Sequence, residues 1–197
     1  AESKPEIRIP KQSLMTKSET DVQWTTGGKI GGDGMNNRAD VFEETYRYYL
    51  SRLRQLSFDS LADTLGAGLE GGSMKVPFFQ SIYWVSEKEI VDQSGKKPPH
   101  DICVILSNYI LMCPAETPLG GGWAHYRDLK NSGPLTAYFA NDVEHAVEKF
   151  FSGKPGALKK AADALKGSYP ELDVDCDVAV QFYALPSIPV LLLYNDE

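Results

Sequence analysis

The chain has 197 residues and a formal net charge of −7, with 42% hydrophobic and 24% charged residues. These fractions are typical of a globular protein, and the length is sufficient for one domain with a substantial core. The acidic balance argues against nucleic-acid binding, because Lys and Arg contacts to phosphates supply most of that affinity. It argues less strongly against binding to anionic lipid. The longest apolar run, residues 102–113, is too short for a membrane span, which needs about 20 residues.

The cysteines and the N-terminal sequence indicate the cellular compartment. Cys103, Cys113 and Cys176 are odd in number and widely spaced, which disfavours a secreted disulfide framework. The first residues contain neither a signal-peptide stretch nor an arginine-rich transit pattern, so we expect a cytoplasmic protein. Cys103 and Cys113 are ten residues apart on one expected helix, a rise of about 15 Å, and so cannot share a metal. We expect buried core thiols, no metal site and no cofactor.

The N-terminal third predicts an arm followed by two helices. The polar, glycine-containing residues 1–39 are expected to form the arm, partly ordered by the rest of the protein. A helix is expected to begin at Asp40, which can cap it, and Glu43 three residues on completes a capping box. A second helix over residues 59–65 is expected to stop at Gly66, which can adopt the left-handed conformation of a C-cap. The first helix has apolar residues at helical spacing: Phe42, Tyr46, Tyr49, Leu50 and Leu53.

The middle of the chain changes to alternating periodicity. Apolar residues alternate over 74–78 and 82–85, and the pair at 90–91 follows a polar turn, which together predict two or three short antiparallel strands. Residues 101–112 are nearly apolar all round and predict a central buried helix. Pro114 cannot continue that helix.

The last third predicts two helices and two strands. Asn141 is expected to begin a helix, with Glu144 three residues on as a second capping box. Pro155 favours the start of another helix, which is expected to end at Gly167. Alternation over residues 178–183 and a wholly apolar run over 190–194 predict two strands.

The order of these elements determines the expected fold class. Helix, strands, helices and strands follow one another without regular alternation, which disfavours a doubly wound parallel sheet. We expect an α+β fold in which a mainly antiparallel sheet has helices packed on one side. Residues 40–197 are expected to form a single domain and residues 1–39 an N-terminal arm.

Several local patterns suggest chemistry but lack the required spacing. The glycine stretch 27–34 has no Gly-Lys followed by Ser or Thr and no preceding strand, so an arm is favoured over a phosphate loop. The histidines have no metal-ligand spacing, and no Gly-x-Ser-x-Gly elbow is present. An alternating acidic run could form a weak calcium site, although a charged strand edge is favoured. The histidines are His100, His125 and His145, and the acidic run contains Asp173, Asp175 and Asp177.

The segment 120–129 is the best candidate for a binding site. Its glycine triplet lets the backbone approach a ligand, or the protein core, closely. It also contains the residue types that dominate recognition surfaces, and arginine suits carboxylate or phosphate groups. The alternative is a tight loop whose tryptophan fills part of the core. The candidate binding residues are Gly121, Gly122, Trp123, His125, Tyr126 and Arg127. No catalytic residue is assigned.

Several short stretches, which span most of residues 41–197, match the pattern of a known family. They are Tyr46–Leu53 with Leu65-Gly66-Ala67, Ile90-Val91-Asp92 with Gly95 and the helix 102–111, Pro118-Leu119 with Gly122-Trp123 and Tyr126–Leu129, and Leu185–Val190 with Leu193-Tyr194. In these stretches the chain resembles the prokaryotic family called domain of unknown function 3786.

The resemblance implies a cellular context rather than an activity. It supplies no established activity, but members look like proteins of anaerobic bacteria and archaea. Some are fused to a cysteine-rich iron–sulfur segment, which implies an association with redox proteins. This chain has no such segment, so we expect it to bind no cluster itself.

Three functions follow as hypotheses. The first is a non-enzymatic accessory or binding protein of redox or metabolic complexes. The second is an enzyme or binding protein for a small anionic ligand anchored by Arg127, with His125 or His100 as the acid–base group. The third is a structural subunit that is covered by a partner protein or a second copy, with the arm wrapped around its neighbour. A pocket lined by these side chains would favour the second hypothesis.

Overall fold

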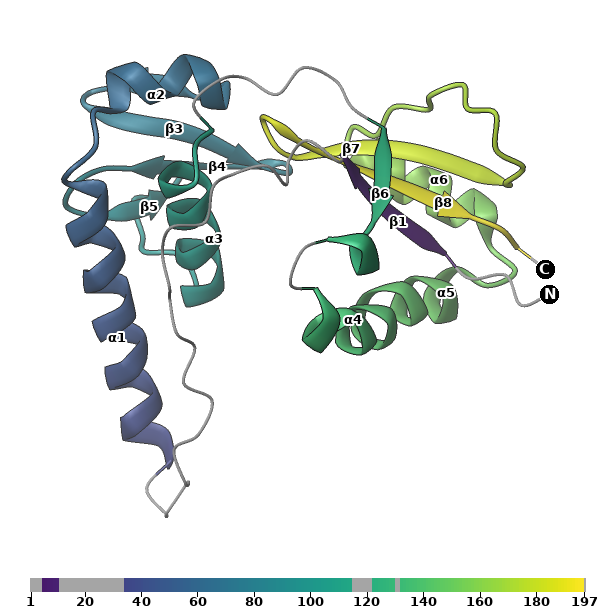
Figure 1. Ribbon diagram of the computed structural model, residues 1–197, viewed down its shortest axis with the longest axis horizontal. Helices are drawn as coiled ribbons and strands as arrows, with labels where there is room; N and C mark the ends of the chain where they lie inside the picture. The colour runs from purple at the N-terminus through teal and green to yellow at the C-terminus, as the bar shows by residue number, and fades with distance from the viewer. Residues whose placement is uncertain (1–4, 11–33, 115–121, 130–131, 197) are drawn as a thin grey trace. The chain divides into compact units, whose positions relative to one another are not determined.

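The computed structural model describes residues 5–10, 34–114, 122–129 and 132–196. The chain divides into two compact units. Unit 1 contains residues 1–15, 78–80 and 118–197, and unit 2 contains residues 16–77 and 81–117. Each unit has its own four-stranded antiparallel sheet (Figure 1). The α+β class and the antiparallel pairing are confirmed, although the strands form two sheets where the sequence predicted one.

Unit 2 contains the first three helices. These are α1 (Gly34–Leu53), α2 (Phe58–Leu65) and α3 (His100–Leu111). The predicted start of α1 at Asp40 is wrong, because the helix already begins at Gly34. Met35, Arg38 and Ala39 are good helix formers, and a preference of about 1 kcal/mol for Asp at a cap does not prevent the helix from starting earlier.

The predicted C-cap of α2 and the buried character of α3 are confirmed. Gly66 has φ 66°, the left-handed conformation that favours glycine. Buried residues of α3 include Cys103, Leu106 and Ile110, and α3 contacts α1. A tyrosine of α1 also ties the two helices together, since Asn108 Nδ2 donates to Tyr49 Oη over 3.1 Å. The core of unit 2 is therefore built on the α1–α3 pair.

The sheet of unit 2 has the order β2-β3-β4-β5. Its strands are β2 (Gly68–Glu70), β3 (Ser73–Phe78), β4 (Ser81–Val85) and β5 (Ile90–Asp92). The three predicted strands are present, and β2 is an addition that the sequence analysis did not predict. Its three residues are all exposed, so no apolar alternation marks them.

The sheet of unit 1 has the order β6-β1-β8-β7. Its strands are β1 (Glu6–Pro10), β6 (Trp123–His125), β7 (Val178–Leu185) and β8 (Ile188–Tyr194). Both predicted C-terminal strands are confirmed. Residues 6–10, part of the predicted arm, form the inner strand β1. Its backbone groups pair with both β6 and β8, and these partners are distant in sequence. The remaining arm residues 11–33 lie outside the described residues.

The helices of unit 1 form one long helical stretch and one short helix. In the stretch, α4 (Gly133–Phe139) continues through a π-helical turn (Ala140–Glu144) into α5 (His145–Phe151). The predicted start at Asn141 is therefore wrong. Pro134 in the first turn of α4 suits a helix start as well as an Asn cap does. The short helix α6 (Pro155–Ala164) begins at its predicted residue and ends slightly earlier than predicted.

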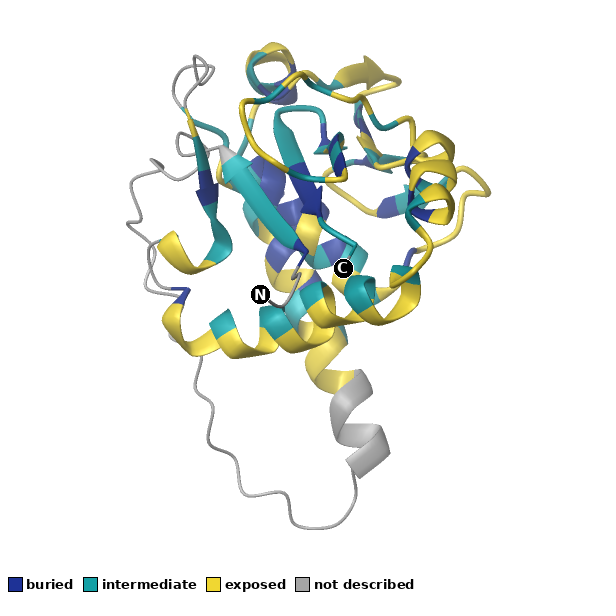
Figure 2. Ribbon diagram, turned by 90° about the vertical axis from the view of Figure 1, so that its right-hand side faces the viewer, coloured by how far each residue is buried: buried dark blue, intermediate teal, exposed yellow. Residues whose placement is uncertain are grey.

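One face of the unit 1 sheet packs on helices, as predicted. The core there joins Leu158 and Ala162 of α6 to alternate residues of β7 and β8. Figure 2 shows the ribbon coloured by how far each residue is buried. Val147 and Phe151 of α5 and Ile7 of β1 pack against this cluster. Because side chains alternate along a strand, the residues between these project from the opposite face of the sheet. In the described parts of the chain, no helix is both long and apolar enough to cross a membrane.

Candidate functional site

The predicted binding segment lies in unit 1 at the edge of its sheet. Trp123 and His125 are on the edge strand β6, and Tyr126 and Arg127 follow in a short 3-10 helix (Tyr126–Asp128). Gly122 is exposed just before β6. Gly121 lies outside the described residues. Residues 123–128 of the candidate segment therefore form a strand and a 3-10 helix, which the sequence analysis did not predict.

Pairing with β1 determines where the side chains of β6 project. Ala124 is buried, with 3% of its surface exposed, and pairs with Ile9. Trp123 and His125 flank Ala124 and are half-buried, so they project from the other face of the strand. His125 pairs directly with Arg8. The sheet face that faces away from the helical core therefore has a polar edge.

A three-residue polar cluster occupies this edge. His125 Nδ1 contacts Glu6 Oε1, and Glu6 is also held by Arg8, whose Nε and Nη2 donate to the two carboxylate oxygens over 3.2 and 3.0 Å. The three side chains are 25–30% exposed. A carboxylate that holds one ring nitrogen orients the imidazole and leaves Nε2 for another partner. Within the described residues, no group forms a hydrogen bond or ion pair with that nitrogen.

The cluster includes two residues that the sequence analysis missed. Glu6 and Arg8 were assigned to the N-terminal arm. Their only local signal is the alternation of Glu6 and Arg8 with Ile7 and Ile9. This alternation is too short to predict a strand, and it does not indicate which strands would pair with it.

Arg127 and the following Asp128 are exposed, whereas His125 and Tyr126 before them are half-buried. Its backbone carbonyl accepts a hydrogen bond of 3.0 Å from the hydroxyl of Ser132, which is buried. No carboxylate in the described parts of the chain pairs with its guanidinium. A fixed backbone and a free cation are what an anion-binding arginine needs.

Tyr126 has a structural contact. Its ring stacks on Phe139 of α4 with centroids 4.2 Å apart and an interplanar angle of 9°. This contact ties the 3-10 helix to α4 and so supports the backbone of Arg127, which lies two residues after His125. Tyr126 is therefore better described as a support than as a ligand contact.

The other histidines do not join this cluster. His100 belongs to unit 2, where its ring stacks on Phe42 at 4.4 Å. His145 is an exposed residue at the start of α5. In the described residues, no group of three His, Cys, Asp or Glu side chains is arranged to hold a metal ion.

The acidic run before β7 is partly used for structure. Asp177 Oδ2 accepts a hydrogen bond of 2.7 Å from the backbone N–H of Asp196, and its own N–H donates to Asn195 Oδ1 over 3.2 Å. Asp173 and Asp175 are exposed. These contacts join the start of β7 to the residues after β8.

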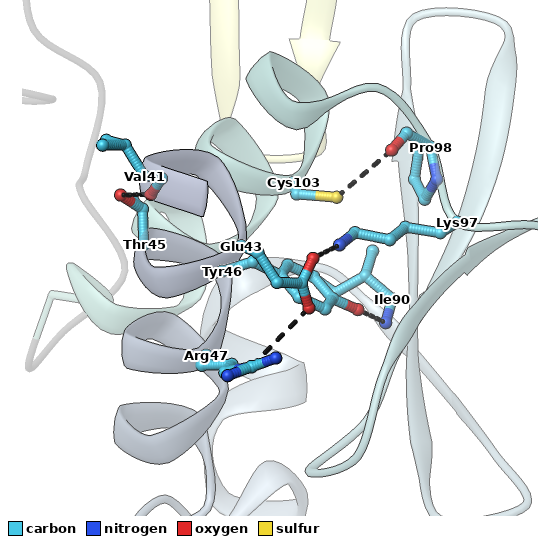
Figure 3. Close-up of polar contacts among 9 residues, drawn as sticks. All are labelled: Val41, Glu43, Thr45, Tyr46, Arg47, Ile90, Lys97, Pro98 and Cys103. Atoms are coloured by element: carbon cyan, nitrogen blue, oxygen red, sulfur yellow. Dashed lines mark hydrogen bonds and ion pairs between the residues drawn. The ribbon is translucent and has the colours of Figure 1, made fainter. Parts of the chain in front are cut away.

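The cysteines have the character of unreactive thiols. Cys103 is 1% exposed, and its Sγ lies 3.6 Å from the carbonyl oxygen of Pro98 (Figure 3). Burial raises the pKa of Cys103 and of Cys113. The pKa of Cys176 is raised by burial and by the neighbouring carboxylates of Asp175 and Asp177. Because the thiolate is the nucleophilic form, none of the three has the environment of a catalytic cysteine.

A second polar cluster lies in unit 2 and links α1 to the segment after β5. Lys97 Nζ lies 2.8 Å from Glu43 Oε2 and 3.7 Å from the centroid of the Tyr46 ring (Figure 3). Tyr46 Oη accepts a hydrogen bond of 2.9 Å from the backbone N–H of Ile90. The hydrogen bond from Lys97 lowers the pKa of Glu43. Because both charged groups already have partners, this cluster has a structural role, and we call the Glu43–Lys97 contact the latch.

Comparison with known proteins identifies a family. The family model "Domain of unknown function (DUF3786)" matches residues 57–197, a range that contains the Trp123–Arg127 segment and most of both sheets. No curated protein and no solved structure matches the chain.

Proposed function

The chain belongs to the family named domain of unknown function (DUF3786), and from this membership and the geometry at β6 we propose that it is a non-enzymatic accessory or binding protein. We place it with redox or metabolic complexes in the cytoplasm of anaerobic prokaryotes, the setting that the family resemblance implies. Its binding residues belong to strand β6 and the following 3-10 helix, residues 123–128, which we call the β6 segment.

The observation that carries this proposal is the exposed guanidinium of Arg127, which pairs with no carboxylate of the described residues and belongs to a residue two positions after His125 of the His125–Glu6–Arg8 cluster. Arg127 supplies a cation for a carboxylate or phosphate group. Glu6 orients His125, which presents its second ring nitrogen as a further hydrogen-bonding group. Trp123 projects from the same face as His125 and adds an aromatic surface. The ligand class that fits these groups is a small anion.

The first experiment is native mass spectrometry of the protein purified anaerobically from its own cells, together with two variants. We expect a small anion to accompany the wild-type protein and Lys88→Ala but not Arg127→Ala. Lys88 is the matched control because it is an exposed cation of unit 2. If Arg127→Ala retained the ligand, Arg127 would not be its binding residue and the proposed site in the β6 segment would be wrong. A bare chain, or a complex with other proteins only, would leave the partner protein as the molecule to identify.

The contact between His125 and Glu6 favours a second candidate, an enzyme that acts on the same small anion. A histidine oriented by a carboxylate is a common general base. The two candidates differ in one measurement. If the co-purified anion is returned to fresh protein, an enzyme converts it and His125→Gln abolishes the conversion, whereas a binding protein returns it unchanged.

A further inference from the structure

A basic surface lies around α6, in a chain whose net charge is −7. Residues 149–166 contain five lysines and one acidic residue, Asp163. The lysines are Lys149, Lys154, Lys159, Lys160 and Lys166, and all five are exposed. We call this set, with α6 itself, the α6 basic surface.

The charges of the α6 basic surface are not neutralised within the described parts of the chain. None of the five ammonium groups forms an ion pair with a described carboxylate. The carboxylate of Asp163 accepts a hydrogen bond of 2.7 Å from the neutral hydroxyl of Tyr169, so it keeps its own charge but pairs with none of the five lysines. The surface therefore keeps its positive charge available to an outside partner.

The geometry of α6 places its lysines away from the core. Leu158 and Ala162 are buried and define the inner side of the helix. Lys159 and Lys160 lie about 100° and 200° around the helix from Leu158, so both project outward. Lys154 precedes the helix and Lys166 follows it, which spreads the charges along a length of about 15 Å.

Exposed apolar side chains occur in the same stretch of the sequence as these lysines. Phe150 of α5 is 71% exposed, Leu165 is 41% exposed and Tyr169 is 46% exposed. Aromatic side chains are enriched in protein–protein interfaces, whereas surfaces that only need solubility avoid them. A positive surface with an exposed Phe suits a partner that combines acidic and apolar side chains.

We propose that the α6 basic surface is a docking site for a partner protein with an acidic, partly apolar surface. This site is separate from the β6 segment and does not depend on the proposed function. An acidic protein is favoured over nucleic acid or membrane because Glu171, Asp173, Asp175 and Asp177 follow directly in the same unit. Extended phosphate surfaces would be repelled by this acidic segment, whereas a local acidic patch on a protein can avoid it.

The test uses the full chain and two short labelled peptides of equal length, one of Glu-Glu-Ala repeats and one of Glu-Glu-Phe repeats, with binding measured by fluorescence anisotropy at several salt concentrations. We expect Lys159→Glu/Lys160→Glu to weaken binding of both probes by about tenfold or more at low salt. The matched control Lys88→Glu/Lys96→Glu makes the same charge change at exposed lysines of unit 2 and is expected to alter binding by less than about twofold. Near-UV circular dichroism checks that each variant keeps its fold.

The aromatic part is tested by Phe150→Ala, which is expected to weaken binding of the Glu-Glu-Phe peptide and leave binding of the Glu-Glu-Ala peptide unchanged. Equal losses in the two charge variants would overturn the proposal, because the effect would then be one of net charge alone. Tighter binding to heparin or to phosphatidylglycerol vesicles through Lys159 and Lys160 would also overturn it and would assign the surface to nucleic acid or membrane.

Discussion

Glu6 and His125 contact one another across neighbouring strands, Oε1 against Nδ1, although they are far apart in the sequence. The contact joins the inner strand β1 to the edge strand β6 on the sheet face that does not pack on the helical core. It gives the imidazole a fixed orientation and places Arg8 in the same cluster through its own bonds to Glu6. The candidate site thus depends on a strand formed by residues near the N-terminus.

The first prediction concerns this contact. Glu6→Ala should lower the free energy of unfolding by about 1 kcal/mol, because it removes charge-assisted hydrogen bonds from a cluster that is about one-quarter exposed. Urea unfolding of Glu6→Ala, His125→Ala and the double variant measures the coupling between the two side chains. The exposed Glu44 provides the matched control, since Glu44→Ala should change stability by less than about 0.5 kcal/mol. Fully additive effects of the two substitutions would contradict the contact.

The second prediction concerns the latch between Glu43 and Lys97. The pKa of Glu43 is lowered in the folded protein from 4.5, chiefly by the hydrogen bond from Lys97, so the folded state favours the ionised carboxylate. This stabilisation is present above the unfolded-state pKa and is lost as the pH falls through the lowered value. Glu43→Gln should therefore be less stable than wild type at neutral pH, and the difference should shrink below pH 4.5.

The measurement for the latch is urea unfolding of wild type, Glu43→Gln and Glu44→Gln across this pH range. Glu44 has no contact within the described residues and is exposed, so its variant should follow the wild-type pH profile. A difference between wild type and Glu43→Gln that stays constant with pH would exclude an electrostatic origin.

The third prediction concerns the reactivity of Cys176. The carboxylate of Asp175 contributes to the raised pKa of this thiol. Asp175→Asn should lower that pKa and speed alkylation of Cys176 near neutral pH by about twofold to fivefold. Mass spectrometry of peptides from iodoacetamide time courses measures each cysteine separately. Cys113 provides an internal control and should react at the same rate in both proteins, while the buried Cys103 should react most slowly in the folded state.

The fourth prediction compares two glycines of unit 1. A Cβ at Gly167 would lie 2.5 Å from Val180 Cγ2 and 2.9 Å from Phe182 Cε1, so Gly167→Ala should destabilise the fold by about 1–3 kcal/mol through overpacking. At Gly156, in the first turn of α6, a Cβ meets open space within 4 Å. Gly156→Ala should therefore stabilise by about 0.5–1 kcal/mol, because alanine lowers the entropy of the unfolded chain. Thermal unfolding of both variants measures these changes in stability. If Gly156→Ala lost more stability than Gly167→Ala, the close packing of Gly167 against Val180 and Phe182 would be refuted.

Much of the fold follows from local patterns. The apolar residues of α3, the glycine cap at Gly66 and the alternation along β7 each predicted an element that the structure contains. These signals are reliable because helix periodicity, positive φ at glycine and strand alternation arise from the residues of the element itself.

Helix starts were predicted less well. Asp40 and Asn141 both have a glutamate three residues on, yet each lies beyond the start of its helical stretch. A capping preference of about 1 kcal/mol is smaller than what a few added turns gain from tertiary contacts and good helix formers. A capping box therefore marks a position that can start a helix, not one that must.

The sequence by itself determined the α+β class, the antiparallel strands, the family and the segment Trp123–Arg127 as the candidate binding site. Only the tertiary structure decided that residues 6–10 form the strand that pairs with this segment, and that Glu6 and Arg8 hold His125. The reason is physical. A short strand gains its stability from hydrogen bonds and side-chain pairs with partners distant in the sequence, so the five residues of β1 have no local pattern strong enough to identify them.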